Sequence, residues 1–215
     1  MAENRTSFLI DGFNLYHSLR EASNDLGGAS TKWIDIQAWC RAHLSSISPN
    51  ARIQSIHYFS ALAGHLEATN PGVTARHRAL LACLTATGVQ VTLSRFKKKD
   101  TVVCKQCNAR RNRHEEKETD VAMAVKLLEL LFTDACDTVV LVTGDTDLAP
   151  AVRTARELCP EKEIMFGFPY KRKNRELEKL VSRSFVFSKE SYAKYQLADP
   201  FRLPDGAKVW KPQSW

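Results

Sequence analysis

The sequence predicts an α/β protein: a three-layer α/β/α sandwich whose mainly parallel sheet has five or six strands. Two observations favour this fold. Short apolar segments alternate with longer segments of helical periodicity along most of the 215 residues. The strand segments are nearly continuous in apolar residues, which is typical of parallel strands buried on both faces. Right-handed crossovers between parallel strands would then place helices on both sides of the sheet.

Each expected strand is a short apolar or alternating run that ends at a turn signal. The first strand ends at Asp11-Gly12, and the fourth ends just before Gly144. The five expected strands are residues 7–10, 53–59, 89–96, 138–142 and 163–168.

The expected helices fill the connections between these strands. The strongest begins behind a capping Thr119 and repeats apolar residues at helical intervals, namely Val121, Val125, Leu128 and Phe132. A later helix carries Pro150 in its first turn, where proline is tolerated. The expected helices are residues 15–26, 33–44, 75–87, 119–132, 147–158 and 175–181.

One domain accounts for residues 1–195, because the chain shows no internal repeat and no low-complexity linker. A basic insert that contains two cysteines occupies about residues 97–116. Residues 196–215 form a proline-containing tail without clear periodicity, which either drapes over the core or is mobile.

Composition excludes several classes of protein. The chain is 44% hydrophobic and 26% charged, and no apolar run approaches the roughly 18 residues that span a bilayer. Its first residues lack the three-part layout of a secretion signal, so we expect a cytoplasmic protein without membrane contact. Four scattered cysteines, expected to be free and mostly buried thiols, are Cys40, Cys83, Cys136 and Cys159.

The net charge of +7 is concentrated in one segment. Residues 95–113 contain eight of the 31 basic residues and one of the 24 acidic residues, so the rest of the chain carries 23 of each. This pattern favours contact with a polyanion such as a nucleic-acid backbone, although a solvated loop without a partner is the alternative. Candidate phosphate contacts in and beside the segment are Lys97, Lys98, Lys99, Arg110, Arg111, Arg113 and Lys117.

Acidic residues follow the first and fourth expected strands. In open α/β sheets, ligands bind beyond the carboxyl ends of the strands where the strand order reverses. If the strand order is 3-2-1-4-5, then Asp11, Asp145 and Asp147 lie at that point. Asp120 opens the helix that leads into the fourth strand, and joins them if that helix start lies nearby.

Clustered carboxylates repel one another and are tolerated mainly when a cation compensates them, and oxygen ligands favour Mg²⁺ or Mn²⁺. Such a site suits phosphoryl chemistry. Each acid also has a structural alternative, because Asp147 and Asp120 fit helix N-termini and Asp11-Gly12 is a common turn. The joint placement of the acids favours a metal site.

Three stretches carry a resemblance to a known family. They are Ile10-Asp-Gly-Phe-Asn-Leu-Tyr16, the segment 114–125 and the segment 141–150. In order and spacing they resemble the NYN domain family of PIN-like metal-dependent ribonucleases, over roughly residues 5–190.

The resemblance implies that Asp11, Asp120, Asp145 and Asp147 line a centre for Mg²⁺ or Mn²⁺ that hydrolyses RNA, with Asn14 and Thr143 assisting. Many relatives carry another acid six positions after the helix aspartate, where this chain has Lys126. The resemblance leaves the number of bound metal ions, one or two, undecided. Fewer ions would leave more of the charge stabilisation to a cation such as Lys117.

Cys104, Cys107 and His114 have a spacing that could bind zinc. A closed site needs a fourth ligand, from a distant residue such as His65 or from a second chain in a homodimer. The alternative is a surface turn with two reduced thiols.

Two further features have open interpretations. The basic segment 170–175 either extends the phosphate contacts or is only a charged helix start. Four aromatic residues could stack on RNA bases or pack in the core: Phe13, Tyr16, Phe96 and Tyr170.

The sequence therefore predicts a metal-dependent endoribonuclease-like enzyme, in which a metal-bound water hydrolyses phosphodiester bonds of single-stranded or structured RNA. The nearest alternative is a DNA or flap-type nuclease. A non-catalytic RNA-binding or regulatory module is another. A transferase with a metal-diphosphate motif at 145–147 is less consistent, because it leaves Asp11 and Asp120 without a role.

Overall fold

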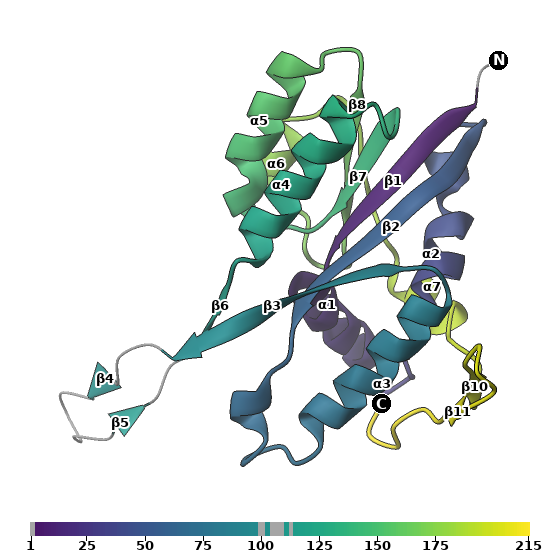
Figure 1. The fold of residues 1–215 in the computed structure, drawn as a ribbon, viewed down its shortest axis with the longest axis vertical. Coiled ribbons are helices and arrows are strands. Elements are labelled where there is room, and N and C mark those ends of the chain that lie inside the picture. Colours follow the sequence, from purple (N-terminus) through teal and green to yellow (C-terminus); the bar gives the residue numbers. More distant parts are fainter. Residues whose placement is uncertain (1–2, 99–101, 104–109, 112–113) are drawn as a thin grey trace.

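The computed structural model describes residues 3–98, 102–103, 110–111 and 114–215. Its central sheet has the strand order β6-β3-β2-β1-β7-β8-β9 (Figure 1). All neighbours are parallel except β6, which runs antiparallel to β3. The predicted α/β fold with a mainly parallel sheet is confirmed. The strands are β1 (Asn4–Asp11), β2 (Ala51–Ala61), β3 (Gln90–Lys98), β6 (His114–Lys117), β7 (Thr138–Val142), β8 (Glu163–Phe168) and β9 (Ser184–Val186).

The strand order reverses between β1 and β7. Strand β1 pairs with β2 on one side and with β7 on the other, and the chain then continues outward through β8 and β9. The predicted 3-2-1-4-5 order is therefore confirmed, and β9 adds a sixth parallel strand that lies outside the five expected segments.

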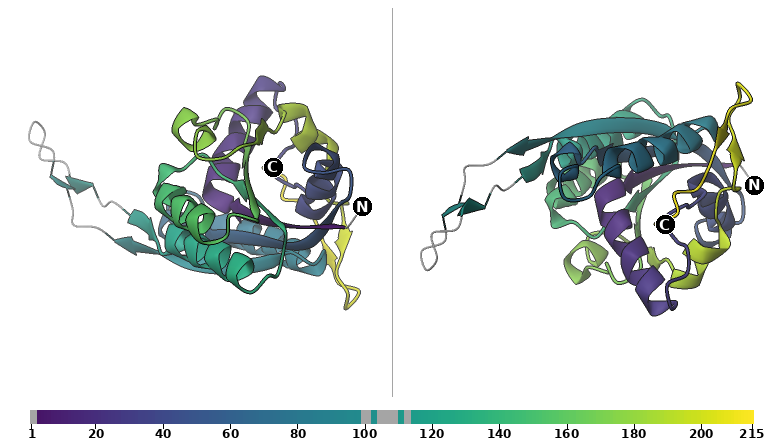
Figure 2. Two further views of the ribbon diagram at one scale, coloured as in Figure 1. Left: turned by 90° about the horizontal axis from the view of Figure 1, so that it is seen from above. Right: turned by 90° about the horizontal axis from the view of Figure 1, so that it is seen from below.

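Helices cover both faces of the sheet (Figure 2). Side chains of α1, α2, α3 and α7 contribute to one buried cluster, and those of α4, α5 and α6 contribute to the other. Within the described residues, short 3-10 helices lie between strands and helices, namely η1 (Leu44–Ser46), η2 (Gly64–Leu66) and η3 (Thr146–Leu148). The helix bounds are α1 (Gly12–Asp25), α2 (Ile36–Ala42), α3 (Val73–Ala86), α4 (Thr119–Phe132), α5 (Ala149–Leu158), α6 (Arg175–Glu178) and α7 (Lys189–Lys194).

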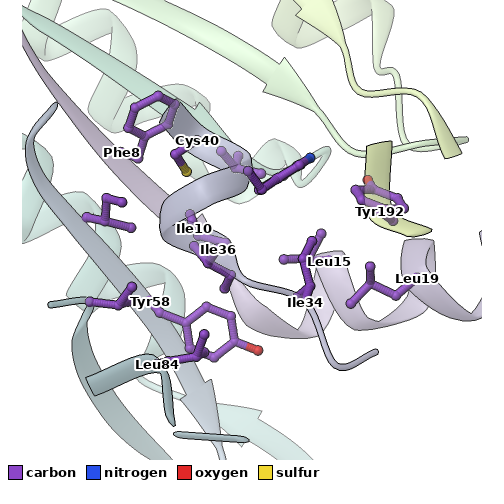
Figure 3. Packing of buried hydrophobic residues seen from close by; sticks show 14 of the residues in the cluster. Phe8, Ile10, Leu15, Leu19, Ile34, Ile36, Cys40, Tyr58, Leu84 and Tyr192 are labelled. Atoms are coloured by element: carbon purple, nitrogen blue, oxygen red, sulfur yellow. The ribbon is translucent and has the colours of Figure 1, made fainter. Parts of the chain in front are cut away.

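The two clusters arise because successive residues of a strand point to opposite faces of the sheet. Phe8 and Ile10 of β1 join the cluster beneath α1 and α2 (Figure 3). Leu9, between them, joins the cluster beneath α4 and α5. All three are fully buried. Burial of one such side chain stabilises the fold by about 1.5–3 kcal/mol, so a strand buried on both faces is firmly held in register.

Helix α4 has its predicted bounds, but the residues that predicted it lie mostly on its solvent side. Val121, Val125 and Phe132 are 66%, 58% and 55% exposed. The buried face consists of Met123, Leu127, Leu130 and Leu131, a second apolar stripe in the same apolar segment. The expected capping role of Thr119 is also wrong, because the N-cap position is Glu118, which has a φ of 78° and no side-chain capping bond.

The C-terminal tail drapes over the core cluster beneath α2. The indole of Trp33 donates to the backbone oxygen of Ala198 at 3.1 Å, and its ring contacts that of Trp215 with centroids 6.2 Å apart. The tail contains the strand pair β10 (Phe201–Arg202) and β11 (Lys208–Val209).

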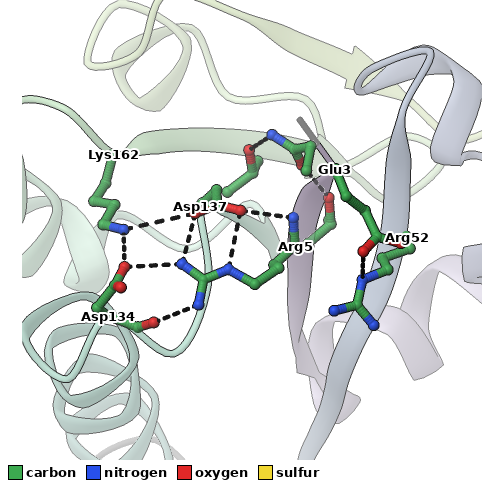
Figure 4. Close-up of polar contacts among 9 residues, drawn as sticks. Glu3, Arg5, Arg52, Asp134, Asp137 and Lys162 are labelled. Atoms are coloured by element: carbon green, nitrogen blue, oxygen red, sulfur yellow. Dashed lines mark hydrogen bonds and ion pairs between the residues drawn. The ribbon is translucent and has the colours of Figure 1, made fainter. Parts of the chain in front are cut away.

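An ion cluster ties together the amino edge of the sheet (Figure 4). The guanidinium of Arg5 donates to both carboxylate oxygens of Asp137, at 2.7 and 3.1 Å, and also to Asp134. Lys162 forms ion pairs with the same two acids. Since Arg5 belongs to β1 and Asp137 precedes β7, the cluster joins these strands at the end opposite to their carboxyl termini.

Strands β3 and β6 extend as a ribbon beyond the body of the sheet (Figure 1). Lys97 pairs in register with Glu115, and Lys98 with His114. The short strands β4 (Val102–Val103) and β5 (Arg110–Arg111) form a separate antiparallel pair in the insert. Of the basic residues of β3, Lys97 lies opposite an acidic residue of β6, whereas Arg95 lies opposite Lys117.

Two expectations about the chain as a whole concern membranes and thiols. In the part of the chain that the structure describes, no helix is long and apolar enough to cross a membrane. The thiols predicted to be free and buried are so, and burial raises the pKa of Cys83 to about 11. The four thiols are Cys40, Cys83, Cys136 and Cys159.

Candidate active site

The carboxyl ends of β1 and β7 form the centre of the candidate site. Asp11 is the last residue of β1, and Thr143, Gly144 and Asp145 follow β7 directly. Because β1 and β7 are parallel neighbours, their carboxyl ends lie side by side at the point where the strand order reverses. The topology thus puts the first and fourth strand ends where the sequence predicted them.

A buried threonine links the two strand ends. The hydroxyl of Thr143 donates to Oδ2 of Asp11 at 2.9 Å and accepts from the backbone N–H of Asp145 at 3.1 Å. Thr143 is fully buried and Asp11 is only 5% exposed. A buried carboxylate is costly unless it is hydrogen-bonded, so this threonine stabilises the ionised Asp11 in its position.

Asp11 also begins α1. Its Oδ1 accepts from the backbone N–H of Asn14 at 2.9 Å, so the carboxylate caps the helix. The helix dipole favours a negative charge at this end. The structural role of Asp11 is therefore real. It does not exclude a chemical role, because each carboxylate oxygen has two lone pairs and can accept from more than one partner.

Two glycines allow the elements of the site to approach closely. A Cβ atom at Gly12 would lie 2.6 Å from the backbone oxygen of Phe59 and from the ring of Tyr58. A Cβ atom at Gly144 would collide with the backbone oxygen of Arg172. Gly12 and Gly144 therefore permit tight packing of the site against β2 and against the backbone of Arg172.

The side-chain amide of Asn14 closes the gap between α1 and the loop after β7. Its Oδ1 accepts from the backbone N–H of Gly144 at 3.2 Å. Asn14 was predicted to assist at the exit of the first strand, and the structure gives it a positioning contact there.

Asp145 and Asp147 lie together in the turn after β7. Oδ1 of Asp145 accepts from the backbone N–H of Asp147 at 3.0 Å, which makes Asp145 the N-cap of η3. Its Oδ2 accepts no hydrogen bond from the described residues. The carboxylate of Asp147 is exposed to solvent. The N-cap role expected for Asp147 is not observed, because the N-cap position of α5 is Leu148, which forms no side-chain capping bond.

Asp120 lies in the first turn of α4, which packs against β1 and η3. The helix follows β6 directly and ends before β7 begins, so its first turn lies toward the carboxyl edge of the sheet. Lys126, six residues later, forms an ion pair with Glu129 at 2.6 Å. At that position the chain thus presents a cation that is already paired within α4.

The predicted acids do not form one compact group of metal ligands in the described part of the chain. Among the residues with described placement, no group of three or more His, Cys, Asp and Glu side chains is close enough to hold a metal ion. Mg²⁺ usually keeps several of its waters and is bound by one or two carboxylates together with substrate phosphates. Thr143 contacts the carboxylate of Asp11 and the backbone N–H of Asp145, so it links these two residues of the predicted acidic group.

The candidate phosphate contacts divide into three groups. Lys97, Lys98 and Lys117 are exposed on the β3–β6 ribbon. The backbones of Arg110 and Arg111 belong to β5, and their side chains are outside the description. Lys99 and Arg113 lie outside the described residues altogether, as do the predicted zinc ligands Cys104 and Cys107, and the side chain of His114.

The family of the chain follows from a comparison with family models. The model of the NYN domain matches residues 5–189, which is most of the chain and includes every acid discussed above. The chain belongs to the NYN domain family. NYN domains are members of the PIN-like nuclease superfamily, whose nucleases generally use divalent metal ions.

A solved structure supports the fold of this NYN domain. A protein of unknown function, VPA0982 from Vibrio parahaemolyticus RIMD 2210633, is similar with a TM-score of 0.57 and 17% identity over 91% of this chain and 97% of that chain. A proposed UDP-N-acetylglucosamine 2-epimerase from Listeria monocytogenes has a TM-score of 0.36 and 11% identity over 89% of this chain and 41% of that chain. This TM-score is too low for a comparison of folds. No curated protein matches the chain.

The NYN domain also has site residues that sequence reasoning missed. The side-chain amide of Asn174 donates to the backbone oxygen of Gly144 at 3.3 Å, while its Oδ1 caps α6. An asparagine two residues before an acidic residue at a helix start is a signal that could have identified this cap. Asn174 therefore fixes the outer side of the loop after β7.

The basic segment 170–175 is largely neutralised within the NYN domain. Lys171, Arg172 and Lys173 form ion pairs with Asp25, Glu21 and Glu178. These pairs join the segment to α1 and α6, which favours the structural interpretation of the segment over an extended phosphate track.

A hollow of about 440 Å³ lies between η2 and β3 of the NYN domain, near the same edge of the sheet. The rings of His65 and Phe96 border it, with centroids 4.6 Å apart. Arg95, which also borders it, forms an ion pair with Glu118 at 2.6 Å. His65 thus lies beside the base of the ribbon. The zinc hypothesis that named His65 stays untested, because Cys104 and Cys107 lie outside the described residues.

Proposed function

We propose that this NYN domain is a metal-dependent endoribonuclease that hydrolyses phosphodiester bonds at the crevice between β1 and β7. The observation that carries the proposal is the Thr143 hydroxyl, which holds the buried Asp11 carboxylate beside the start of the Asp145 turn. A purely structural N-cap would not require a second, buried link between two strand ends at the ligand-binding edge.

Asp11 and Asp145 would hold Mg²⁺ or Mn²⁺, with Asp120 and Asp147 able to add direct or water-mediated contacts. When bound, such a cation would polarise the phosphodiester, lower the pKa of the attacking water and stabilise charge on the departing oxygen. Thr143 and Asn14 act as positioning residues, because each binds the main chain or an acid of the site rather than the substrate.

The RNA backbone would contact the exposed cations of the β3–β6 ribbon. Lys97, Lys98 and Lys117 are exposed, and the ribbon leads directly into α4, whose first turn carries Asp120. A strand of RNA bound along the ribbon would therefore be guided toward the crevice. Such backbone contacts carry affinity without sequence preference and weaken with salt.

Cleavage of labelled RNA tests the proposal. Wild-type protein and Asp145→Asn are incubated with single-stranded RNA and DNA in Mn²⁺, in Mg²⁺ and in chelator. The matched control is Asp35→Asn, because Asp35 is also a helix N-cap that accepts from a backbone N–H at 2.9 Å, but it lies at the start of α2. Asparagine is as good an N-cap as aspartate, so both variants should keep the fold.

The expected result is metal-dependent cleavage of RNA by wild type and by Asp35→Asn, with a rate at least a hundredfold lower in Asp145→Asn. Cleavage of DNA alone would replace the proposal with a DNA nuclease. Binding of RNA without cleavage in any metal would replace it with a non-catalytic RNA-binding module. Equal activity of Asp145→Asn and wild type would exclude Asp145 from the chemistry.

A further inference from the structure

Three aromatic rings form a cluster on the solvent side of the first two turns of α1. The ring of His17 lies edge-on to Phe13 at a centroid distance of 4.5 Å and to Tyr16 at 5.7 Å. Phe13 is 50% exposed and Tyr16 is 39% exposed. We call Phe13, Tyr16 and His17 the ring cluster.

Core packing does not account for the ring cluster. Helix α1 buries its opposite face, where Leu15, Leu19 and Ala22 are at most 4% exposed. A single exposed apolar residue is ordinary on a protein surface. Three adjoining rings on one face of a helix are less common on a protein surface. Exposed apolar residues that form a group mark a contact site more often than isolated ones do.

The ring cluster lies immediately beside the candidate active site. Phe13 is two residues after Asp11, so their Cα atoms are at most about 7.6 Å apart. The close packing of Gly12 against β2 and the contact of Asn14 with Gly144 fix the first turn of α1 against the strand ends. A planar group on Phe13 would thus adjoin whatever occupies the crevice.

The charges around the ring cluster favour a ligand that combines an uncharged aromatic ring with a nearby negative charge, as a nucleotide does. Burial lowers the pKa of His17, and the nearby Arg172 and Arg20 lower it further, so the imidazole is uncharged at neutral pH. The guanidinium of Arg20 lies 5.9 Å from the centre of the Tyr16 ring. Flat uncharged rings flanked by arginine are typical of surfaces on which nucleic-acid bases stack.

We propose that the ring cluster is a stacking platform for an unpaired base next to the scissile phosphate, so that the substrate is RNA that is single-stranded at the cut. This inference deepens the function proposed above and rests on it. A paired base cannot reach such a platform, because both of its faces are stacked within the helix. The platform selects for strand separation and not for base identity, since every base has a π-face.

Binding measurements in chelator test the platform without cleavage. Fluorescence anisotropy is used to measure the dissociation constant for a labelled RNA of about 12 nucleotides, as a single strand and annealed to its complement. The test variant is Phe13→Ala with Tyr16→Ala. The matched control is Val121→Ala with Phe132→Ala, which removes two comparably exposed apolar side chains from α4.

The platform variant should bind the single strand about 5- to 150-fold more weakly, the range expected for the loss of one stacked base, and should bind the duplex as wild type does. The control should bind both as wild type does. Phe13→Leu, which keeps apolar bulk and removes the ring, should show part of the loss. Thermal unfolding of each variant identifies any loss of fold.

The outcomes separate this inference from the proposed function. If wild type cleaves RNA but the platform variant binds the single strand as tightly as wild type, the platform is wrong and the nuclease stands. If wild type cleaves nothing but the platform variant still loses single-strand affinity, the nuclease is wrong and the platform stands as a binding surface. Equal loss for single strand and duplex would also overturn the platform.

Discussion

Replacement of Thr143 by valine would remove the hydroxyl that links the two strand ends while keeping the shape of the side chain. The hydroxyl of Thr143 is fully buried, donates to Asp11 at 2.9 Å and accepts from the backbone N–H of Asp145. A hydrogen bond to a charged group contributes about 1.5–3 kcal/mol, and its loss leaves a buried carboxylate with one donor fewer. The Thr143→Val protein should therefore unfold with a free energy about 1.5–3 kcal/mol lower.

Strand β7, which Thr143 follows directly, offers a control at its other end. Thr138 is also fully buried, and its hydroxyl oxygen accepts from the neutral side-chain amide of Asn4 at 2.9 Å. Loss of a neutral hydrogen bond costs about 1 kcal/mol. Thr138→Val should therefore be clearly less destabilising than Thr143→Val, although both substitutions exchange the same atoms at fully buried positions.

Urea unfolding followed by tryptophan fluorescence gives both free energies, and thermal unfolding gives a second measure. For a chain of this length, the Thr143→Val melting temperature should fall by roughly 3–12 °C. The same variant should also show lower RNA cleavage, because Asp11 loses its fixed position. A Thr143→Val protein no less stable than Thr138→Val would refute the argument that the hydroxyl stabilises an ionised Asp11.

Three further predictions concern other parts of the chain. Gly144→Ala places a methyl group against the backbone of Arg172 and should lower the free energy of unfolding by about 1–3 kcal/mol. Gly64→Ala, where the nearest atom is 3.9 Å from the added carbon, should change little in the same urea titration, and equal losses would contradict the close packing. Lys97→Gln with Lys98→Gln should flatten the dependence of log Kd on log salt by about 1.4, and an unchanged slope would exclude the ribbon from the RNA contact. Hydrogen bonds from Arg5 lower the pKa of Asp137 to about 2, so its stabilisation is complete above the unfolded value of 3.8 and is lost as the pH falls toward 2. The difference in unfolding free energy between wild type and Asp137→Asn should thus shrink between pH 5 and pH 2, and a constant difference would rule out the Arg5 contact as its source.

The strand ends of the candidate site were predictable because they depend on local signals. Asp11-Gly12 and Gly144 end apolar runs, and parallel topology then brings those ends to one edge of the sheet. The Thr143 bridge was not predictable, because it depends on the rotamer of one side chain within a packed core. The sequence could name Thr143 as a site residue but not its partner.

The buried face of α4 was not predictable for a different reason. Nearly every position between Val121 and Phe132 is apolar, so two stripes fit the helical period equally well. Packing against β1 and β2 selects the stripe that contains Met123 and Leu127. Likewise, β9 has only three residues, and a strand that short has too few positions to show a period.

The register of the β3–β6 ribbon has a practical consequence for protein design. Lys98 and His114 are paired opposite each other, so a two-residue type I′ turn such as Asn-Gly could connect them directly. A shortened chain of this kind would lack the part of the basic insert that contains the two cysteines, while every hydrogen bond between strands of the central sheet would be kept. Inserts of different length and composition could then be introduced at this turn, so that their effect on RNA binding is measured while the rest of the domain stays unchanged.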